Sequence, residues 1–190
     1  MLNLIIFGPP GAGKGTQSEK LIDRYQLFHI STGDIFRAHI QNDTELGKKV
    51  KNIMASGQLV PDSITIEMLE EEIKKNPNAK GIIFDGFPRT VPQAEALDNF
   101  LNSLNQKVDI VVQLDVNEDE LRKRIAERRK VSGRADDAEE KLIKRMDEYF
   151  NKTIHVLPYY ERQNIVTKVN GIGLIDDIFA KLCAAIDPLV

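Results

Sequence analysis

The stretch GPPGAGKGTQ at residues 8–17 constrains this chain most, because it follows directly on the apolar run LNLIIF at residues 2–7. Residues 8–14 match the pattern G-x-x-x-x-G-K between a predicted strand and a predicted helix. Glycines let such a loop turn its backbone amides inward as a nest for an anion. The helix dipole and the Lys14 ammonium add positive charge, so the loop predicts a polyphosphate site rather than a plain turn.

The loop departs from the general pattern just after the lysine. Gly15 and then Thr16 stand where a serine or threonine usually follows directly. The chain also has no N-K-x-D motif of the kind that recognises guanine. Both observations argue against a GTPase or a motor protein.

Short apolar runs alternate with amphipathic segments along the whole chain. Nearly continuous β-branched runs are typical of strands buried on both faces of a parallel sheet. We expect strands at residues 2–7, 27–31, 82–85, 108–115 and 165–169. We expect helices at residues 14–24, 34–42, 45–56, 62–75, 91–104, 118–129, 138–160 and 174–186. This order predicts an α/β fold, a doubly wound parallel five-stranded sheet with helices on both faces.

Two segments interrupt the simple alternation of strands and helices. Residues 31–60 place extra helices between the second and third strands, and residues 127–137 (ERRKVSGRADD) place a charged loop between two helices. Ligands bind at the carboxyl edge of the sheet in doubly wound folds. We therefore expect both segments to be flaps over that edge.

Composition bounds the remaining possibilities. The 190 residues suit one domain, and the net charge of −3 gives no sign of a nucleic-acid or anionic membrane partner. The one cysteine, Cys183, lies in an apolar run and has no partner for a disulfide, which fits a reducing compartment. No leader pattern and no membrane-length apolar run are present. We expect a cytoplasmic monomer.

Three motifs together resemble the adenylate kinase family of nucleoside monophosphate kinases. They are GPPGAGKGTQ, ISTGDIFR at residues 30–37 and DGFPRT at residues 85–90, and the resemblance runs to about residue 175. It implies a P-loop kinase that reversibly transfers a phosphoryl group from ATP to AMP, giving two ADP, with Mg²⁺. It also implies one domain over 1–190, with a core (1–30, 61–126 and 138–190), an NMP-binding insert (31–60) and a lid (127–137). The lid is short and has no Cys or His cluster, so we expect no zinc.

Phosphoryl transfer depends on positioning and on positive charge around the moving group. Arginine suits this task because its planar fork binds phosphate through two hydrogen bonds and keeps its charge. The resemblance implies a cationic set around the transferred group, made of Lys14, Arg89, Arg124, Arg128, Arg134 and Arg145. Asp85, at the end of an apolar strand, is expected to orient Mg²⁺-bound water without binding the metal directly.

The resemblance also implies two nucleotide sites. The ATP site would be formed by Gly11, Ala12, Gly13, Lys14, Gly15, Thr16, Arg124, Arg128 and Gly173. The AMP site would be formed by Thr32, Gly33, Arg37, Gln58, Leu59, Val60, Gly86, Phe87, Pro88, Arg89, Gln93, Arg134 and Arg145. The amide of Gln93 can donate and accept side by side, which matches the amino group and ring nitrogen of adenine. Thr32 has the alternative role of capping the helix that begins DIFR.

Three alternative functions stay open at this point. A UMP/CMP kinase would share the loop and the arginines but differ at Thr32 and Gln93. A nucleotide-sensing module would bind ATP without turnover, although it would not need so many arginines. An assembly ATPase would need an arginine from a neighbouring subunit and an apolar interface, and the sequence shows no apolar patch for one.

Overall fold

The computed structural model describes residues 1–129 and 139–190. Five parallel strands form its central sheet in the order β2-β3-β1-β4-β5. The strands are β1 (Leu2–Phe7), β2 (Phe28–Ser31), β3 (Gly81–Asp85), β4 (Ile110–Asp115) and β5 (Val166–Asn170). The predicted doubly wound sheet is therefore confirmed.

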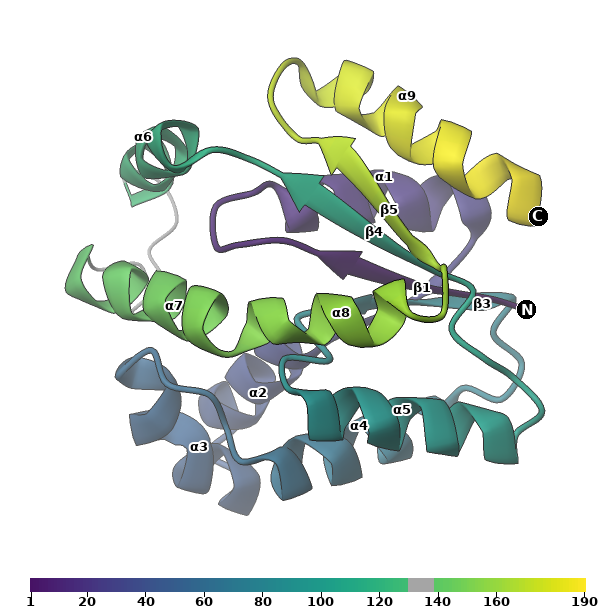
Figure 1. Cartoon of the computed structure of the whole chain (residues 1–190). Helices are drawn as coiled ribbons and strands as arrows, with labels where there is room; N and C mark the ends of the chain where they lie inside the picture. Colours follow the sequence, from purple (N-terminus) through teal and green to yellow (C-terminus); the bar gives the residue numbers. More distant parts are fainter. Residues whose placement is uncertain (130–138) are drawn as a thin grey trace.

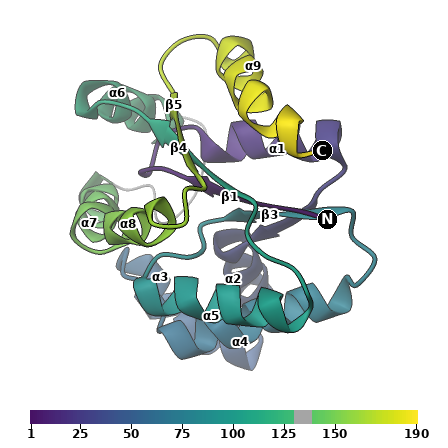
Figure 2. The same cartoon turned by 45° about the vertical axis from the view of Figure 1, so that its right-hand side comes forward.

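Helices cover both faces of the sheet (Figures 1 and 2). One face carries α1 (Lys14–Tyr25), α6 (Glu118–Arg129) and α9 (Ile175–Ile186). The other face carries α4 (Asp62–Lys75), α5 (Val91–Ser103), the end of α7 (Glu139–Asn151), and α8 (Val156–Glu161). Alternate residues of β1 pack into the two cores on opposite faces of the sheet. Leu4 packs against the helices of the first face, and Ile5 packs against those of the second. This is why β1 has no exposed face.

Two further helices, α2 (Thr32–Gln41) and α3 (Glu45–Ala55), have a small core of their own away from the sheet. Phe36, Val50, Val60 and Met68 form it, so it joins these helices to the start of α4. The α2 helix begins at Thr32, and the Ser31 hydroxyl caps it by accepting from the Asp34 amide at 3.3 Å. The cap is thus Ser31, and the alternative capping role for Thr32 is wrong.

The single helix predicted over residues 138–160 is wrong, because the chain breaks there into three pieces. The α7 helix ends at Asn151, a 3₁₀ turn spans Thr153–His155, and α8 follows. Lys152 lies outside helical geometry, with φ −127° and ψ −59°. Pro158 has no N–H for the carbonyl of Ile154, and its ring would clash there in a continuous helix. The chain ends with a second 3₁₀ turn, Asp187–Leu189.

The strand order places the ligand edge of the sheet. The chain leaves β1 toward β2 and β3 on one side, then crosses over β1 to β4 and β5 on the other side. In such folds the crevice at the carboxyl ends of the strands, where the order reverses, binds ligands.

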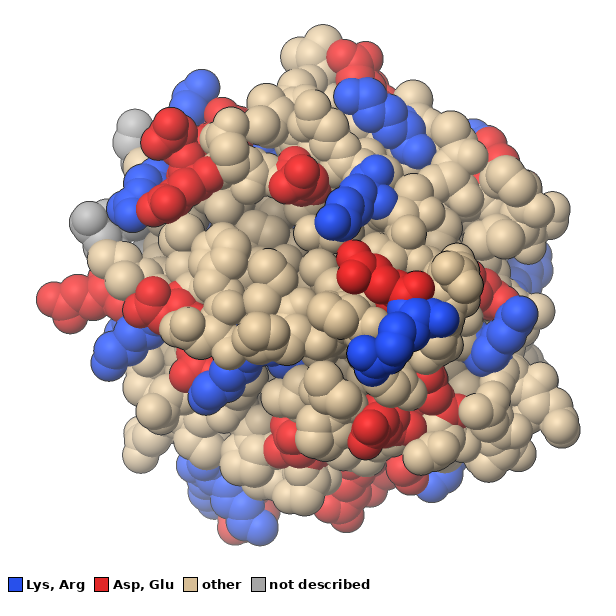
Figure 3. Space-filling model, in the orientation of Figure 1, with Lys and Arg blue, Asp and Glu red and all other residues tan. Residues whose placement is uncertain are grey.

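No helix within the described residues is long and apolar enough to cross a membrane. In the orientation of Figure 1, Figure 3 shows Lys and Arg side chains lying among Asp and Glu side chains over the visible surface.

Candidate active site

The glycine loop joins β1 to α1 at the point where the strand order reverses. Gly13 is the N-cap of α1 and has a left-handed conformation, with φ 93° and ψ 13°, which favours glycine. No side chain caps the α1 amides, and Lys14–Tyr25 has no acidic residue in its first turn. The positive end of this helix is therefore open to an anionic ligand.

Lys14 folds back over the loop. Its Nζ donates to the carbonyl oxygens of Gly8 at 2.8 Å and Pro9 at 3.1 Å. Burial of the ammonium lowers the pKa of Lys14 to about 8, and Asp85 opposes that shift. Arg89, Arg145 and Arg128 lower the pKa further by charge repulsion. The structure thus gathers most of the predicted cations, with Asp85, around one point at the end of the loop.

The lowered pKa predicts a pH dependence for the expected binding of ATP at the loop. Above about pH 8 the Lys14 ammonium loses its proton, so ATP affinity should fall by up to about tenfold per pH unit. Bound phosphate favours the ammonium, so binding near pH 8 should also take up protons. Calorimetry in buffers of different ionisation enthalpy, from about pH 6.5 to about pH 9.5, measures both effects. An inflection of ATP affinity near pH 10.5, the ordinary pKa of lysine, would contradict the assignment of this pH dependence to Lys14 with a lowered pKa.

Arg124 on α6 braces the loop instead of projecting freely from the helix. Its Nη1 donates to the Ala12 carbonyl at 3.2 Å, its Nη2 to the Gly171 carbonyl at 2.8 Å, and its Nε to Glu120 at 2.7 Å. It therefore ties the phosphate loop to the segment between β5 and α9, which contains the predicted ATP contact Gly173. Sequence spacing alone gives no sign of these backbone bonds.

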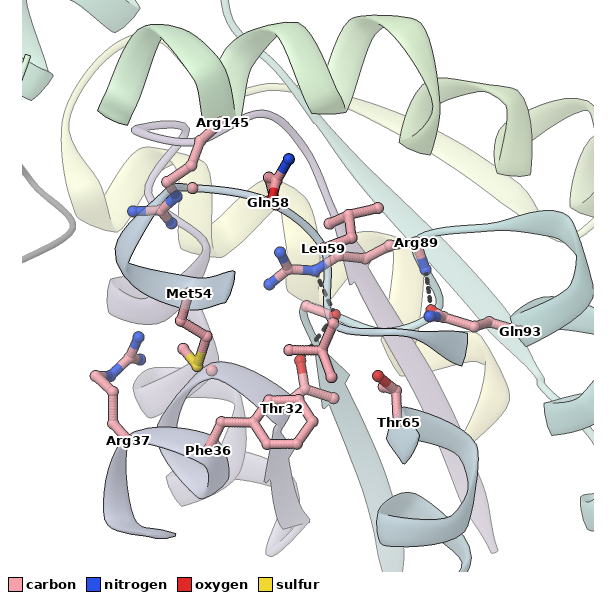
Figure 4. A pocket seen from close by; sticks show the side chains of 14 residues that line it. Thr32, Phe36, Arg37, Met54, Gln58, Leu59, Thr65, Arg89, Gln93 and Arg145 are labelled. Atoms are coloured by element: carbon pink, nitrogen blue, oxygen red, sulfur yellow. Dashed lines mark hydrogen bonds between the residues drawn. The ribbon is translucent and has the colours of Figure 1, made fainter. Parts of the chain in front are cut away.

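A pocket of about 560 Å³ lies between α2, α3 and the segment after β3 (Figure 4). Ten of the predicted AMP-site residues line it: Thr32, Gly33, Arg37, Gln58, Leu59, Val60, Gly86, Arg89, Gln93 and Arg145. Sequence reasoning missed four others: Phe36, Met54, Gly57 and Thr65. Figure 4 shows the guanidinium groups of Arg37, Arg89 and Arg145 on one side of the pocket, with Gln93 and Thr65 on the other. The pocket thus has a cationic end and a neutral polar end.

Gly86 holds the polar wall of this pocket together. Its carbonyl accepts from Arg89 Nε at 2.7 Å and from the Thr32 hydroxyl at 2.9 Å. Gly86 has φ +76°, and a Cβ there would lie 2.8 Å from Arg89 Nη2. A side chain at this position would therefore displace the arginine. Arg37 on α2 is held by an ion pair with Asp34, one turn earlier.

A second cavity of about 540 Å³ lies against the phosphate loop and contains Lys14 in its wall. Phe87 and Pro88, joined by a cis peptide bond, line this cavity rather than the first. Both were predicted in the AMP site, and they line this cavity together with Leu59, Gly86, Arg89 and Arg145 of the same predicted set. Arg89 and Arg145 line both cavities. These two arginines therefore stand between the loop and the cationic end of the first pocket.

The remaining predicted residues are placed as follows. Asp85 ends β3, 4.0 Å from His29 Nε2, and its charge reaches Lys14. Arg128 lies one turn after Arg124 on α6. Gly15 and Thr16 are exposed in the first turn of α1.

Arg134 and most of the predicted lid lie outside the described residues. Within residues 1–129 and 139–190, no cluster of His, Cys, Asp or Glu could hold a metal by itself.

Comparison with known proteins decides the family. A family model described as adenylate kinase matches residues 6–165. The chain belongs to the adenylate kinase family. It is 50% identical to the adenylate kinase of Flavobacterium psychrophilum over 190 residues, which is all of both chains. It is 48% identical over 189 residues to that of Bacteroides thetaiotaomicron, again all of both chains. It is 48% identical to that of Porphyromonas gingivalis over 98% of this chain and 96% of the relative.

The predicted family and activity are thereby confirmed. The enzyme is a phosphotransferase of the adenylate kinase type, as the three motifs indicated. Its phosphate loop, its arginines and the DGFPRT segment converge at one edge of the sheet, where the fold predicts a ligand site.

Proposed function

We propose that the enzyme holds ATP on the phosphate loop and AMP in the pocket beside α2 and α3, with the two phosphate ends facing each other. The shared wall of the two cavities carries this proposal, because Arg89 and Arg145 line both. Phosphoryl transfer needs the donor and acceptor held in line, with charge neutralised between them. Two arginines at the junction meet both needs.

Each cation then has a distinct role. Lys14 and the α1 amides hold the terminal phosphates of ATP, and Arg37 with Arg89 holds the AMP phosphate. Arg145 and Arg128 neutralise the group in transit. Arg145 lines both cavities, and both guanidinium groups lower the pKa of Lys14 by charge repulsion. Arg124 holds the loop and the segment between β5 and α9 in fixed positions through its bonds to Ala12 and Gly171. Arg134 is proposed to join the set from the lid.

Mg²⁺ is proposed to enter with ATP rather than to reside in the protein. The donor set fits this, because Asp85 is a carboxylate at the strand end beside Lys14 and a hard cation prefers oxygen ligands and retained water. Asp85 would hold water bound to the ion. The ion, when bound, supplies positive charge to the phosphates.

The insert (31–60) and the lid (127–137) are proposed to close over the two nucleotides. The packing of α2 on α3 supports this, because Phe36 and Val50 share a small core apart from the two cores of the sheet, and the two helices could move as a unit against Met68 of α4. Closure would exclude water, which otherwise competes as acceptor for the phosphoryl group. We further propose that the enzyme is a cytoplasmic monomer whose partners are ATP, AMP and ADP.

An acceptor assay tests this proposal. With ATP and Mg²⁺, AMP should give ADP at a kcat/KM at least roughly a hundredfold above that for UMP or CMP, because Gln93 and Thr65 line the neutral end of the pocket. Chelation of Mg²⁺ should stop the reaction. Preference for a pyrimidine acceptor would indicate a UMP/CMP kinase, and tight ATP binding without ADP formation would indicate a sensor.

A further inference from the structure

We propose that Asp62 is a positioning residue that fixes the orientation of the Gln93 amide and so sets the preference for a purine with a 6-amino group. The inference rests on the proposed AMP site and goes beyond it. Asp62 is the first residue of α4, directly after the insert, and it does not itself line the pocket. It acts, in this proposal, only through Gln93.

The carboxylate of Asp62 joins α4 to the start of α5. Its Oδ1 accepts from Gln93 Nε2 at 2.7 Å, and its Oδ2 accepts from the Thr90 hydroxyl at 2.9 Å. On the other side of the amide, Gln93 Oε1 accepts from the backbone N–H of Arg89 at 2.7 Å. Both atoms of the Gln93 amide are therefore held from opposite sides.

These partners permit one orientation of the amide. A carboxylate can only accept hydrogen bonds, and a backbone N–H can only donate one. The nitrogen of Gln93 must therefore face Asp62, and the oxygen must face Arg89. Gln93 is only 2% exposed, so water does not compensate for a flipped amide. The second N–H and the second lone pair of the amide keep a fixed direction.

A fixed amide distinguishes bases by their pattern of donors and acceptors. Adenine presents a donor amino group beside an acceptor ring nitrogen, which pairs with an amide acceptor and an amide donor. A 6-oxo purine presents an acceptor in place of that amino group. Its N1 carries a proton, so the neighbouring acceptor becomes a donor. An amide that cannot flip therefore leaves both of its groups unpaired with such a base, and unpaired buried groups give strong discrimination.

A purely structural role is the competing explanation. Asp62 lies in the first turn of α4, where a carboxylate stabilises a helix, and it accepts from the Thr90 hydroxyl that caps α5. Such a role predicts lost stability without a change in base preference. The test must therefore measure nucleotide preference as well as unfolding.

We would compare the Asp62→Ala, Gln93→Ala and double variants with the unchanged full-length enzyme, using AMP and IMP as acceptors. For Asp62→Ala we expect the KM for AMP to rise roughly tenfold. The ratio of kcat/KM for AMP to kcat/KM for IMP should fall roughly tenfold, while the KM for ATP should change by less than about twofold. In the Gln93→Ala background, Asp62→Ala should raise the KM for AMP by less than about a further twofold, because the two residues act as one unit.

Two further variants at Asp62 sharpen the comparison. Asp62→Asn should recover most of the AMP affinity, because its oxygen can face Gln93 while its nitrogen donates to the Thr90 oxygen. Asp62→Ser keeps a small polar side chain in the first turn of α4 but is too short to hold Gln93, so it should lose AMP affinity as Asp62→Ala does. The test therefore does not depend on the alanine variant folding.

Asp177→Ala is the matched control, since it removes an exposed carboxylate from the first turn of α9. It should leave the AMP:IMP ratio unchanged. Two results would overturn the role of Asp62. One is a KM for AMP in the double variant that equals the combined effects of the two single variants, and the other is an unchanged AMP:IMP ratio of kcat/KM in both Asp62→Ala and Asp62→Ser. Absence of ADP formation by the unchanged enzyme would instead overturn the proposed AMP site.

Discussion

Lys14→Met is expected to lower kcat by roughly a thousandfold, because it removes the ammonium that we propose faces the ATP phosphates at the end of the loop. Methionine has a similar length and fits a part-buried site, so the fold should persist. The lowered pKa of Lys14 shows that its charge is unfavourable in the folded protein without ligand. Removing that charge should therefore offset part of the folding stability that is lost with the two hydrogen bonds to Gly8 and Pro9.

A coupled assay of ADP formation measures the activity, and calorimetry measures the midpoint of unfolding. We expect Tm to change by no more than about 5 °C. Lys20→Met is the control, since Lys20 lies on the same helix and pairs with the exposed Asp176 at 2.9 Å. It should change kcat by less than about twofold. Turnover by Lys14→Met within about tenfold of the unchanged enzyme would refute the charge role.

The sheet and the phosphate loop could be predicted from the sequence because their signals are local. The runs IIFD and VDIVVQLD are nearly continuous in apolar residues, as is typical of strands buried on both faces, and they became β3 and β4. The break between α7 and α8 also had a local signal in Pro158, which outweighs the helical periodicity around it. Periodicity alone joined the two helices incorrectly.

The walls of the pocket could be predicted only in part, because they depend on how distant elements meet. Phe36 and Met54 come from different helices and meet only once α2 packs on α3. Phe87 and Pro88 are next to Gly86 and Arg89 in sequence, yet the turn at Gly86 directs them toward the phosphate loop. Asp62 reaches Gln93 across 31 positions of the chain, which no local pattern reveals.

Arg89→Ala is expected to damage AMP handling and chemistry together. The KM for AMP should rise roughly tenfold or more, because one of two guanidinium groups proposed to hold the AMP phosphate is lost. The kcat should also fall, by roughly a hundredfold, because Arg89 lines the cavity beside Lys14 as well. ATP binding should be nearly unchanged, since the loop amides and Lys14 remain.

Steady-state kinetics with AMP and ATP varied in turn separate these effects, and Arg122→Ala is the control. Arg122 is exposed on α6 and pairs with Glu118 one turn earlier, so its loss should change neither parameter by more than about twofold. An unchanged KM for AMP together with an unchanged kcat would remove Arg89 from the site.

The pH profile gives the Arg89 variant a second, independent measurement. Arg89 lowers the pKa of Lys14 by charge repulsion, so its removal should raise that pKa above about 8. The loss of ATP affinity at high pH should therefore begin at a higher pH in Arg89→Ala than in the unchanged enzyme. Arg122→Ala should leave the inflection in place. A profile that stays the same in Arg89→Ala would place its guanidinium too far from Lys14 to act on the same phosphates.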